Sequence, residues 1–197
     1  MKGQVVHQWI SDQGISNPEL LPNGNLICLG KPDPINAGQR GLNGQASKCY
    51  ELDWESNVVW SYEDPWMHHD YERLPDGNTL IVKWEPLPKS LIRKIKGGYQ
   101  NDKDDPGHML GDVVLEVTRE GETVRKWKSW EHLDPTTEII CPLDHRMEWT
   151  HCNSISRTPK GNWLLSFRRI SLLCEVNPKT GKIVWKWGDG TTSHQHD

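Results

Sequence analysis

A short turn sequence, Pro-x-Gly-Asn, occurs three times in this chain, at 22–25, 75–78 and 159–162, each time between apolar runs rich in β-forming residues. Proline fixes one turn dihedral and glycine supplies the positive φ of a tight turn, so each copy predicts a β-hairpin. A second pattern of apolar alternation around a short polar turn follows each copy, at 50–60, 115–127 and 174–185. The repeat therefore predicts four-stranded antiparallel sheets, one after another along the chain.

Repeated four-stranded sheets predict an all-β fold, and specifically a β-propeller, because each sheet needs neighbours to cover both of its faces. The second and third turns are farther apart than the first and second, because two insertions, 86–112 and 131–148, interrupt the pattern. Within them, only 88–96 has helical character. Trp60, Trp127 and Trp185 occupy equivalent strand positions, which predicts packing between neighbouring blades.

We expect a single partial β-propeller over residues 1–197, with about three whole blades. The expected parts are the end of a preceding blade (1–13), a blade (14–63), a blade with the insertion 86–112 (64–130), a connecting loop and blade (131–190) and the start of another blade (191–197). Trp9 matches Trp185 from the truncated first blade. Propellers usually close with at least four blades, so we expect this sequence to be a fragment of a longer protein.

Composition and charge exclude several classes of partner. The net charge is -4 and the pI is near 6.1, which provides no basic field for nucleic acid. No apolar run approaches the roughly 20 residues of a membrane-spanning helix. The N-terminus lacks the apolar core of a signal peptide, which favours a cytoplasmic over a periplasmic location. The five cysteines form no CxxC pair, so we expect buried free thiols. Nothing in the sequence indicates an oligomeric state.

Polar residues gather where the first strand of a repeat begins. Three such starts carry histidines: His68-His69-Asp70, His151-Cys152-Asn153 and His194-Gln195-His196-Asp197. The first strand of each propeller blade lines the central channel, so these groups are expected to converge there. Counting back from the Pro-x-Gly-Asn turns puts His69 level with Asn153. One such histidine alone would be a surface residue, but three successive starts favour a functional site.

Two arginines, Arg168 and Arg169, follow the apolar strand 163–166. Alternation along a strand sends their side chains to opposite faces, so one is expected to face the channel. A guanidinium beside imidazoles would suit the oxygens of a phosphoryl or sulfuryl group. The histidines could instead bind a metal with Asp70 and Asp197. However, the chain has no HExxH motif or paired cysteines, so we expect no metal and no cofactor.

The segments HHDYERLPDGN, EWTHCNSISRTPKGNWLLSFR, EVNPKTGKIVWKWGDG and the terminal HQHD resemble the arylsulfotransferase family, the aryl-sulfate sulfotransferases that use no nucleotide sulfate donor. The resemblance covers most of the chain from about Tyr50 onward. It implies a six-bladed propeller that moves a sulfuryl group from an aryl sulfate to a phenolic acceptor, by a ping-pong mechanism through a sulfohistidine. The resemblance also implies that His196 is the nucleophile, supported by His69, His151, Asn153 and Arg168.

The residue types agree with that chemistry. A neutral imidazole is a competent nucleophile near neutral pH, and a covalent intermediate divides one difficult transfer into two easier ones. Arg168, Asn153 and the other histidines would stabilise charge on the sulfuryl oxygens. Either His69 or His151 would take the proton of the acceptor phenol, and the sequence does not choose between them. Two alternatives remain: a non-catalytic propeller that binds a ligand or protein, and a metal-dependent hydrolase.

Overall fold

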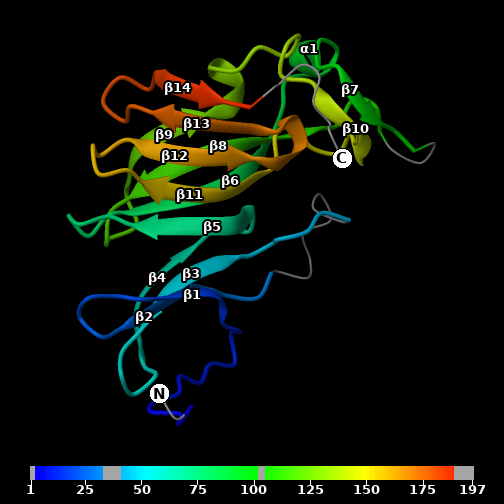
Figure 1. Ribbon diagram of the computed structural model, residues 1–197. Helices are drawn as coiled ribbons and strands as arrows, with labels where there is room; N and C mark the ends of the chain where they lie inside the picture. Colours follow the sequence, from blue (N-terminus) through cyan, green and yellow to red (C-terminus); the bar gives the residue numbers. More distant parts are fainter. Residues whose placement is uncertain (1–2, 33–40, 102–104, 189–197) are drawn as a thin grey trace. The chain divides into compact units, whose positions relative to one another are not determined.

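The computed structural model describes residues 3–32, 41–101 and 105–188, and the regular secondary structure of these residues is almost entirely β-strand (Figure 1). The described residues form three four-stranded antiparallel sheets, each with its strands in chain order. The all-β class and the repeated four-stranded sheets predicted from the turns are thereby confirmed. The chain divides into two compact units, Met1–Met67 and His68–Asp197.

The Met1–Met67 unit contains the first sheet. Its strands are β1 (Ser16–Leu20), β2 (Leu26–Leu29), β3 (Lys48–Leu52) and β4 (Val58–Glu63). Leu26, Cys28, Tyr50 and Leu52 are buried together, and Trp9 packs against them. The indole of Trp9 donates a hydrogen bond of 2.8 Å to the carbonyl oxygen of Asp53, in the turn between β3 and β4.

The other two sheets form most of the His68–Asp197 unit. One consists of β5 (Met67–Arg73), β6 (Thr79–Pro86), β8 (Leu110–Val117) and β9 (Thr123–Lys128). The other consists of β11 (Cys152–Arg157), β12 (Trp163–Phe167), β13 (Leu172–Val176) and β14 (Ile183–Trp187). Both sheets contribute side chains to one buried core, including Val82, Val114, Leu165 and Phe167. Figure 1 shows the two sheets stacked.

The two predicted insertions meet in the structure. The first contains α1 (Lys89–Ile92) and β7 (Gly97–Tyr99), and the second contains β10 (Ile140–His145), which pairs with β7 in parallel. These elements lie together at one end of the His68–Asp197 unit in Figure 1. The first insertion is shorter than the predicted range 86–112, because β6 continues through Pro86 and β8 begins at Leu110. Two short 3-10 helices, η2 (Ser129–Glu131) and η3 (Arg168–Ile170), follow β9 and β12.

The asparagine of each Pro-x-Gly-Asn turn explains why the motif recurs. Its side-chain amide donates to a glutamate on the third strand of its own sheet, at 2.7 to 2.8 Å: Asn25 to Glu51, Asn78 to Glu116 and Asn162 to Glu175. The turn glycines have φ near +90°, a conformation that side chains other than glycine's disfavour. The turn and the sheet beyond it are therefore specified by the same few residues.

The five cysteines are all free and buried, as the sequence analysis predicted. Burial raises the pKa of the Cys174 thiol to about 12 and raises that of Cys152 well above its ordinary value. These thiols therefore stay protonated and behave as small apolar side chains. Within the described part of the chain, no helix has the length and apolar character needed to cross a membrane.

Candidate functional site

Two of the predicted site residues, His69 and His151, meet in the His68–Asp197 unit. His69 lies on β5 and His151 immediately precedes β11, so the two imidazoles come from different sheets. Their ring centroids are 4.4 Å apart, with an interplanar angle of 70°. Both residues have left-handed backbone conformations, with φ of 54° and 55°. Such strain persists only where surrounding contacts enforce it, and it concentrates at functional sites.

His68 and Asp112 support His69 from the interior. Nδ1 of His68 lies 3.0 Å from Nδ1 of His69, and the His68 ring stacks on Trp84 with centroids 3.8 Å apart. On its other side, Nε2 of His68 lies 3.0 Å from Oδ1 of Asp112, a close polar contact without linear hydrogen-bond geometry. His68 and Asp112 are essentially inaccessible to solvent. A buried carboxylate, an imidazole and the His69 ring thus form one continuous chain of contacts.

The Asp112 carboxylate is held in place by two further donors. Its Oδ2 atom accepts hydrogen bonds from the Thr150 hydroxyl and from the backbone N–H of Cys152, the latter at 2.8 Å. Burial alone would raise the pKa of Asp112, but the contacts with His68, Thr150 and Cys152 outweigh it and hold this pKa below its ordinary value. Asp112 is therefore an ionised acceptor at neutral pH.

A second buried carboxylate, Glu148, supports His151. Its Oε1 atom lies 2.6 Å from Nδ1 of His151 and 3.1 Å from the guanidinium of Arg169. Its Oε2 atom accepts a hydrogen bond of 2.7 Å from the indole of Trp84. Glu148 is only 1 % exposed. His151 is therefore in direct contact with a buried acid, Glu148. His69 is connected to its buried acid, Asp112, through His68.

Backbone pairing with β8 fixes the position of Glu148. The segment before β11 forms a parallel bridge between Glu148 and Leu110, at the start of β8. The N–H of Leu110 donates to the carbonyl of Met147, and the N–H of Trp149 donates to the carbonyl of Leu110. The Trp149 side chain is fully buried, and its indole donates to the carbonyl of Glu138 at 2.8 Å. Glu148 is thus held by the sheet that also carries Asp112.

The local environment keeps His69 uncharged. Burial, together with the neighbouring His68 and His151, lowers the pKa of His69 from 6.5 to about 4. At neutral pH, His69 is thus a neutral imidazole beside His151. The pair can exchange hydrogen bonds and protons with a bound substrate, which makes acid–base or nucleophilic chemistry possible here.

The remaining predicted residues have different environments. Asn153 is exposed on β11. Arg168 and Arg169 lie in η3 rather than in a strand, so strand alternation does not orient them. The Arg168 side chain is 54 % exposed and lies 3.1 Å from Asp144, whereas Arg169 is buried against Glu148. The predicted nucleophile, His196, lies outside the described residues, as do His194 and Asp197.

The structure corrects one detail of the sequence alignment between repeats. Counting from the turns placed His69 level with Asn153, but the residue beside His69, with the same left-handed conformation, is His151. The register of β11 is irregular between Cys152 and Ser154, so a regular count from the turn does not apply to the residues before Ser154. Asp70, considered above as a possible metal ligand, accepts a hydrogen bond of 2.8 Å from the N–H of Ile155.

Sequence reasoning noted His68 but gave it no role, and it missed Asp112, Glu148 and Trp84. Glu148 stands three residues before His151, a spacing that could have drawn attention. Asp112 had no such signal, because it stood at the end of the predicted insertion 86–112. Among the described residues, no set of three or more histidines, cysteines or acids is arranged to hold a metal ion.

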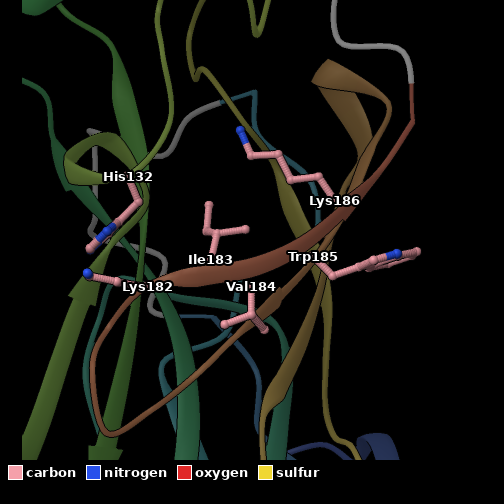
Figure 2. Close-up of a pocket in the computed structure, with 6 residues that line it drawn as sticks. All are labelled: His132, Lys182, Ile183, Val184, Trp185 and Lys186. Carbon is pink, nitrogen blue, oxygen red and sulfur yellow. The ribbon is translucent and has the colours of Figure 1, made fainter.

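A separate surface pocket of about 480 Å³ lies along β14 in the same unit (Figure 2). It is lined by His132 and by Lys182, Ile183, Val184, Trp185 and Lys186. In Figure 2, Ile183 and Val184 point to opposite sides of the strand, and Trp185 points away from His132. This pocket shares no residue with the histidine cluster, which consists of His68, His69, His151, Asp112 and Glu148, so it does not identify the candidate site.

Comparisons with known proteins place the chain in a family. The family model described as Arylsulfotransferase (ASST) matches residues 6–196. No curated protein sequence matches the chain. Among solved structures, a protein of unknown function from Bacteroides caccae, whose crystal structure has a resolution of 1.35 Å, matches with a TM-score of 0.44 and 15 % sequence identity. That match covers 84 % of this chain and 42 % of the other, so this chain spans less than half of that protein. Because the family match extends over nearly the whole sequence, the chain belongs to the arylsulfotransferase (ASST) family.

Proposed function

We propose that this chain is part of an enzyme that transfers a sulfuryl group from an aryl sulfate to a phenolic acceptor. The observation that carries the proposal is the meeting of His69 and His151 at 4.4 Å, with a buried carboxylate behind each: Glu148 contacts His151 directly, and Asp112 contacts His68, which lies against His69. Packing of two sheets does not require two imidazoles at their contact, and burial of Asp112 and Glu148 is costly unless they are paired. Membership of the arylsulfotransferase family supports sulfuryl transfer as the reaction class.

The proposed architecture is a six-bladed β-propeller, of which the three four-stranded sheets are blades. Two equivalent tryptophans support it. Trp127, on the last strand of its sheet, donates a hydrogen bond of 2.9 Å to the carbonyl of Gly181, in the turn between the third and fourth strands of the next sheet. Trp9 makes the same kind of bond, at 2.8 Å, to Asp53 of the first sheet. Trp9 precedes β1 and lies outside the strands, but its contact reaches the same kind of turn, and such a repeated contact is expected of successive blades.

The proposed reaction has two half-reactions. In the first, an imidazole nitrogen of His196 attacks sulfur, the N–S bond forms, the S–O bond to the aryl group breaks, and the leaving phenolate takes up a proton. In the second, the acceptor phenol gives its proton to a base, its oxygen attacks the sulfohistidine, and the N–S bond breaks. The two steps are chemically the reverse of each other, so one histidine can donate the proton in the first and accept it in the second.

Arg168 and Asn153 are the proposed contacts for the sulfuryl oxygens. Both are exposed, and both carry N–H donors that could face a bound substrate. Arg168 would leave its ion pair with Asp144 or share its guanidinium between the carboxylate and the substrate. A planar guanidinium suits two oxygens of a sulfuryl group, whose negative charge is shared over several oxygens.

The test is phenol release from a chromogenic aryl sulfate by the full-length protein, with and without a second phenol. We expect release that depends on the acceptor and that falls at least about a thousandfold in His196→Ala, as for other catalytic nucleophiles. An acid-labile, base-stable sulfuryl adduct on His196 is expected when acceptor is withheld. His108→Ala, which removes an exposed histidine outside the cluster, should retain activity.

Three outcomes would contradict the proposal. Acceptor-independent release that a chelator abolishes would indicate the metal-dependent hydrolase. Absence of release from folded protein, with every aryl sulfate tried, would favour a propeller that binds a ligand without transforming it. Transfer that persists in His196→Ala would show that the nucleophile is another residue.

A further inference from the structure

We propose that Glu148 is a positioning residue that selects one tautomer of His151 and so makes His151, rather than His69, the histidine that exchanges a proton with the phenol. The inference rests on the proposed sulfuryl transfer for its reaction, but its structural half concerns Glu148 and His151 alone. It chooses between two histidines that the sequence could not distinguish.

The donors around Glu148 determine the direction of its hydrogen bonds. The Trp84 indole and the Arg169 guanidinium can only donate, and they approach the carboxylate at 2.7 and 3.1 Å. Oε2 of Glu148 thus accepts from Trp84, and Oε1 faces Arg169, so both carboxylate oxygens serve as acceptors. The remaining neighbour, Nδ1 of His151 at 2.6 Å, must therefore be the donor. A neutral His151 with its proton on Nδ1 has its lone pair on Nε2.

This arrangement prepares His151 for proton transfer. With Nδ1 fixed against the buried carboxylate, Nε2 lies at the opposite side of the ring and is the nitrogen left to contact a phenol. When Nε2 takes up a proton, the neighbouring carboxylate stabilises the imidazolium, as a buried acid does in a catalytic triad. The same carboxylate also holds the ring orientation, because Glu148 is itself fixed by Trp84, Arg169 and the bridge to Leu110.

The Nδ1 atom of His69 has a different neighbour from that of His151. It faces another imidazole, that of His68, at 3.0 Å. Burial and the adjacent histidines disfavour a proton on His69, whose pKa falls to about 4. His69 is then suited to bind the substrate as a neutral group, while His151 exchanges the proton with the phenol. The two imidazoles that meet at 4.4 Å thus take different roles.

The experiment compares two donors in wild type and Glu148→Gln. A nitrophenyl sulfate releases a phenolate that is stable without a proton, whereas unsubstituted phenyl sulfate needs a proton on the leaving oxygen. General acid–base catalysis contributes about 10² to 10⁴ in rate, so the variant should lose at least about a hundredfold on phenyl sulfate. On nitrophenyl sulfate, the loss should be about tenfold or less. His151→Ala should show the same selective loss, and His69→Ala should slow both donors equally.

Glu116→Gln is the matched control, because Glu116 is a buried glutamate, 2 % exposed, on β8 and outside the cluster. Any general effect of losing a buried charge should appear there too, and it should slow both donors by the same factor. Equal losses on the two donors in Glu148→Gln would overturn the proposal and leave Glu148 a purely structural residue. If that variant does not fold, Glu148→Asp keeps the charge but shortens its reach, and it should show the same selective loss.

A second measurement needs no turnover. Nitrogen-15 NMR of the histidines reports which ring nitrogen carries the proton, and we expect His151 to be the Nδ1–H tautomer in wild type. In the Glu148 variants, the Nε2–H tautomer should become substantial. A wild-type His151 protonated on Nε2 would refute the inference even if the enzyme transfers sulfuryl groups. Conversely, failure of sulfuryl transfer with the expected tautomer would refute the proposed function and retain the role of Glu148 in orienting His151.

Discussion

Replacement of Asp112 tests whether the histidine cluster is held together by its buried acids. The carboxylate accepts hydrogen bonds from the Thr150 hydroxyl and the Cys152 backbone N–H, and it contacts His68 at 3.0 Å. Asparagine can keep its carbonyl toward Thr150 and Cys152, while its amide group would face His68. A neutral His68 can turn that nitrogen into an acceptor by changing tautomer, so no donor need be left unpaired.

The expected energies follow from these contacts. A hydrogen bond to a charged group contributes ~1.5–3 kcal/mol and a neutral one ~0.5–1.5 kcal/mol, so Asp112→Asn, which weakens two bonds, should cost about 2 kcal/mol. Asp112→Ala leaves the donors of Thr150 and Cys152 buried without an acceptor, at ~1–3 kcal/mol each, and adds a small cavity. We therefore expect a cost of about 4–5 kcal/mol for the alanine variant.

The assay is urea denaturation followed by tryptophan fluorescence, combined with hydrogen exchange at the Cys152 amide, which donates to Asp112. That amide should lose protection in Asp112→Ala and largely keep it in Asp112→Asn. Asp76→Asn, in an exposed turn, is the control and should change stability by less than about 0.5 kcal/mol. An alanine variant within about 1 kcal/mol of wild type, or equal costs for Asn and Ala, would refute the reasoning, given the size of the expected penalties.

The pH dependence provides an independent check on Asp112. Its pKa in the folded protein lies below the ordinary value of 3.8, so its contribution to stability is fully present above that value and is lost as the pH falls through the folded pKa. The stability difference between wild type and Asp112→Asn should therefore be constant near neutral pH and shrink in strong acid. A difference that grew in acid would contradict an ionised, paired Asp112.

Two further predictions concern other parts of the His68–Asp197 unit. The pKa of His69 is lowered from 6.5 to about 4 in the folded protein, so stability should fall as the pH drops from about 6.5 to about 4, and His69→Gln should flatten that slope. Proton NMR titration of the His69 ring is the direct measurement, and a midpoint near 6.5 would contradict burial of a neutral imidazole. Gly97 has a φ of +76°, and a Cβ atom there would overlap the carbonyl of Ile140, so Gly97→Ala should separate β7 from β10. Urea denaturation should show a larger loss than for Gly121→Ser, where the site is open and substitution meets only the backbone cost of a positive φ, about 1–2 kcal/mol.

Local sequence patterns determined the sheets. The Pro-x-Gly-Asn turns and the apolar alternation around them are sufficient to place each hairpin, because a hairpin depends on residues close together in the chain. The structure adds the reason for the asparagine, which bonds to a glutamate on the third strand. The turn asparagine and its glutamate can both be read from the repeat, although their contact cannot.

The sequence identified the histidines of the cluster but not the acids that contact them. His69 and His151 stood out because they occur where two repeats begin, and residue identity at a repeated position needs no coordinates. Which residues they meet depends on bulges and loop pairing. Both histidines adopt left-handed conformations, the register of β11 is irregular at its start, and His151 lies beside His69.

The supporting acids were decided by tertiary structure alone. Asp112 and Glu148 lie far apart in the sequence. Asp112 lies on β8 itself, and Glu148 reaches the cluster because the segment before β11 pairs with the start of β8. In the sequence they look like two of many surface acids, since burial and hydrogen-bond partners are properties of the packed chain. The sequence by itself therefore determined the repeated sheets and the histidines, whereas packing decided which carboxylates hold those histidines in place and which ring nitrogen each one contacts.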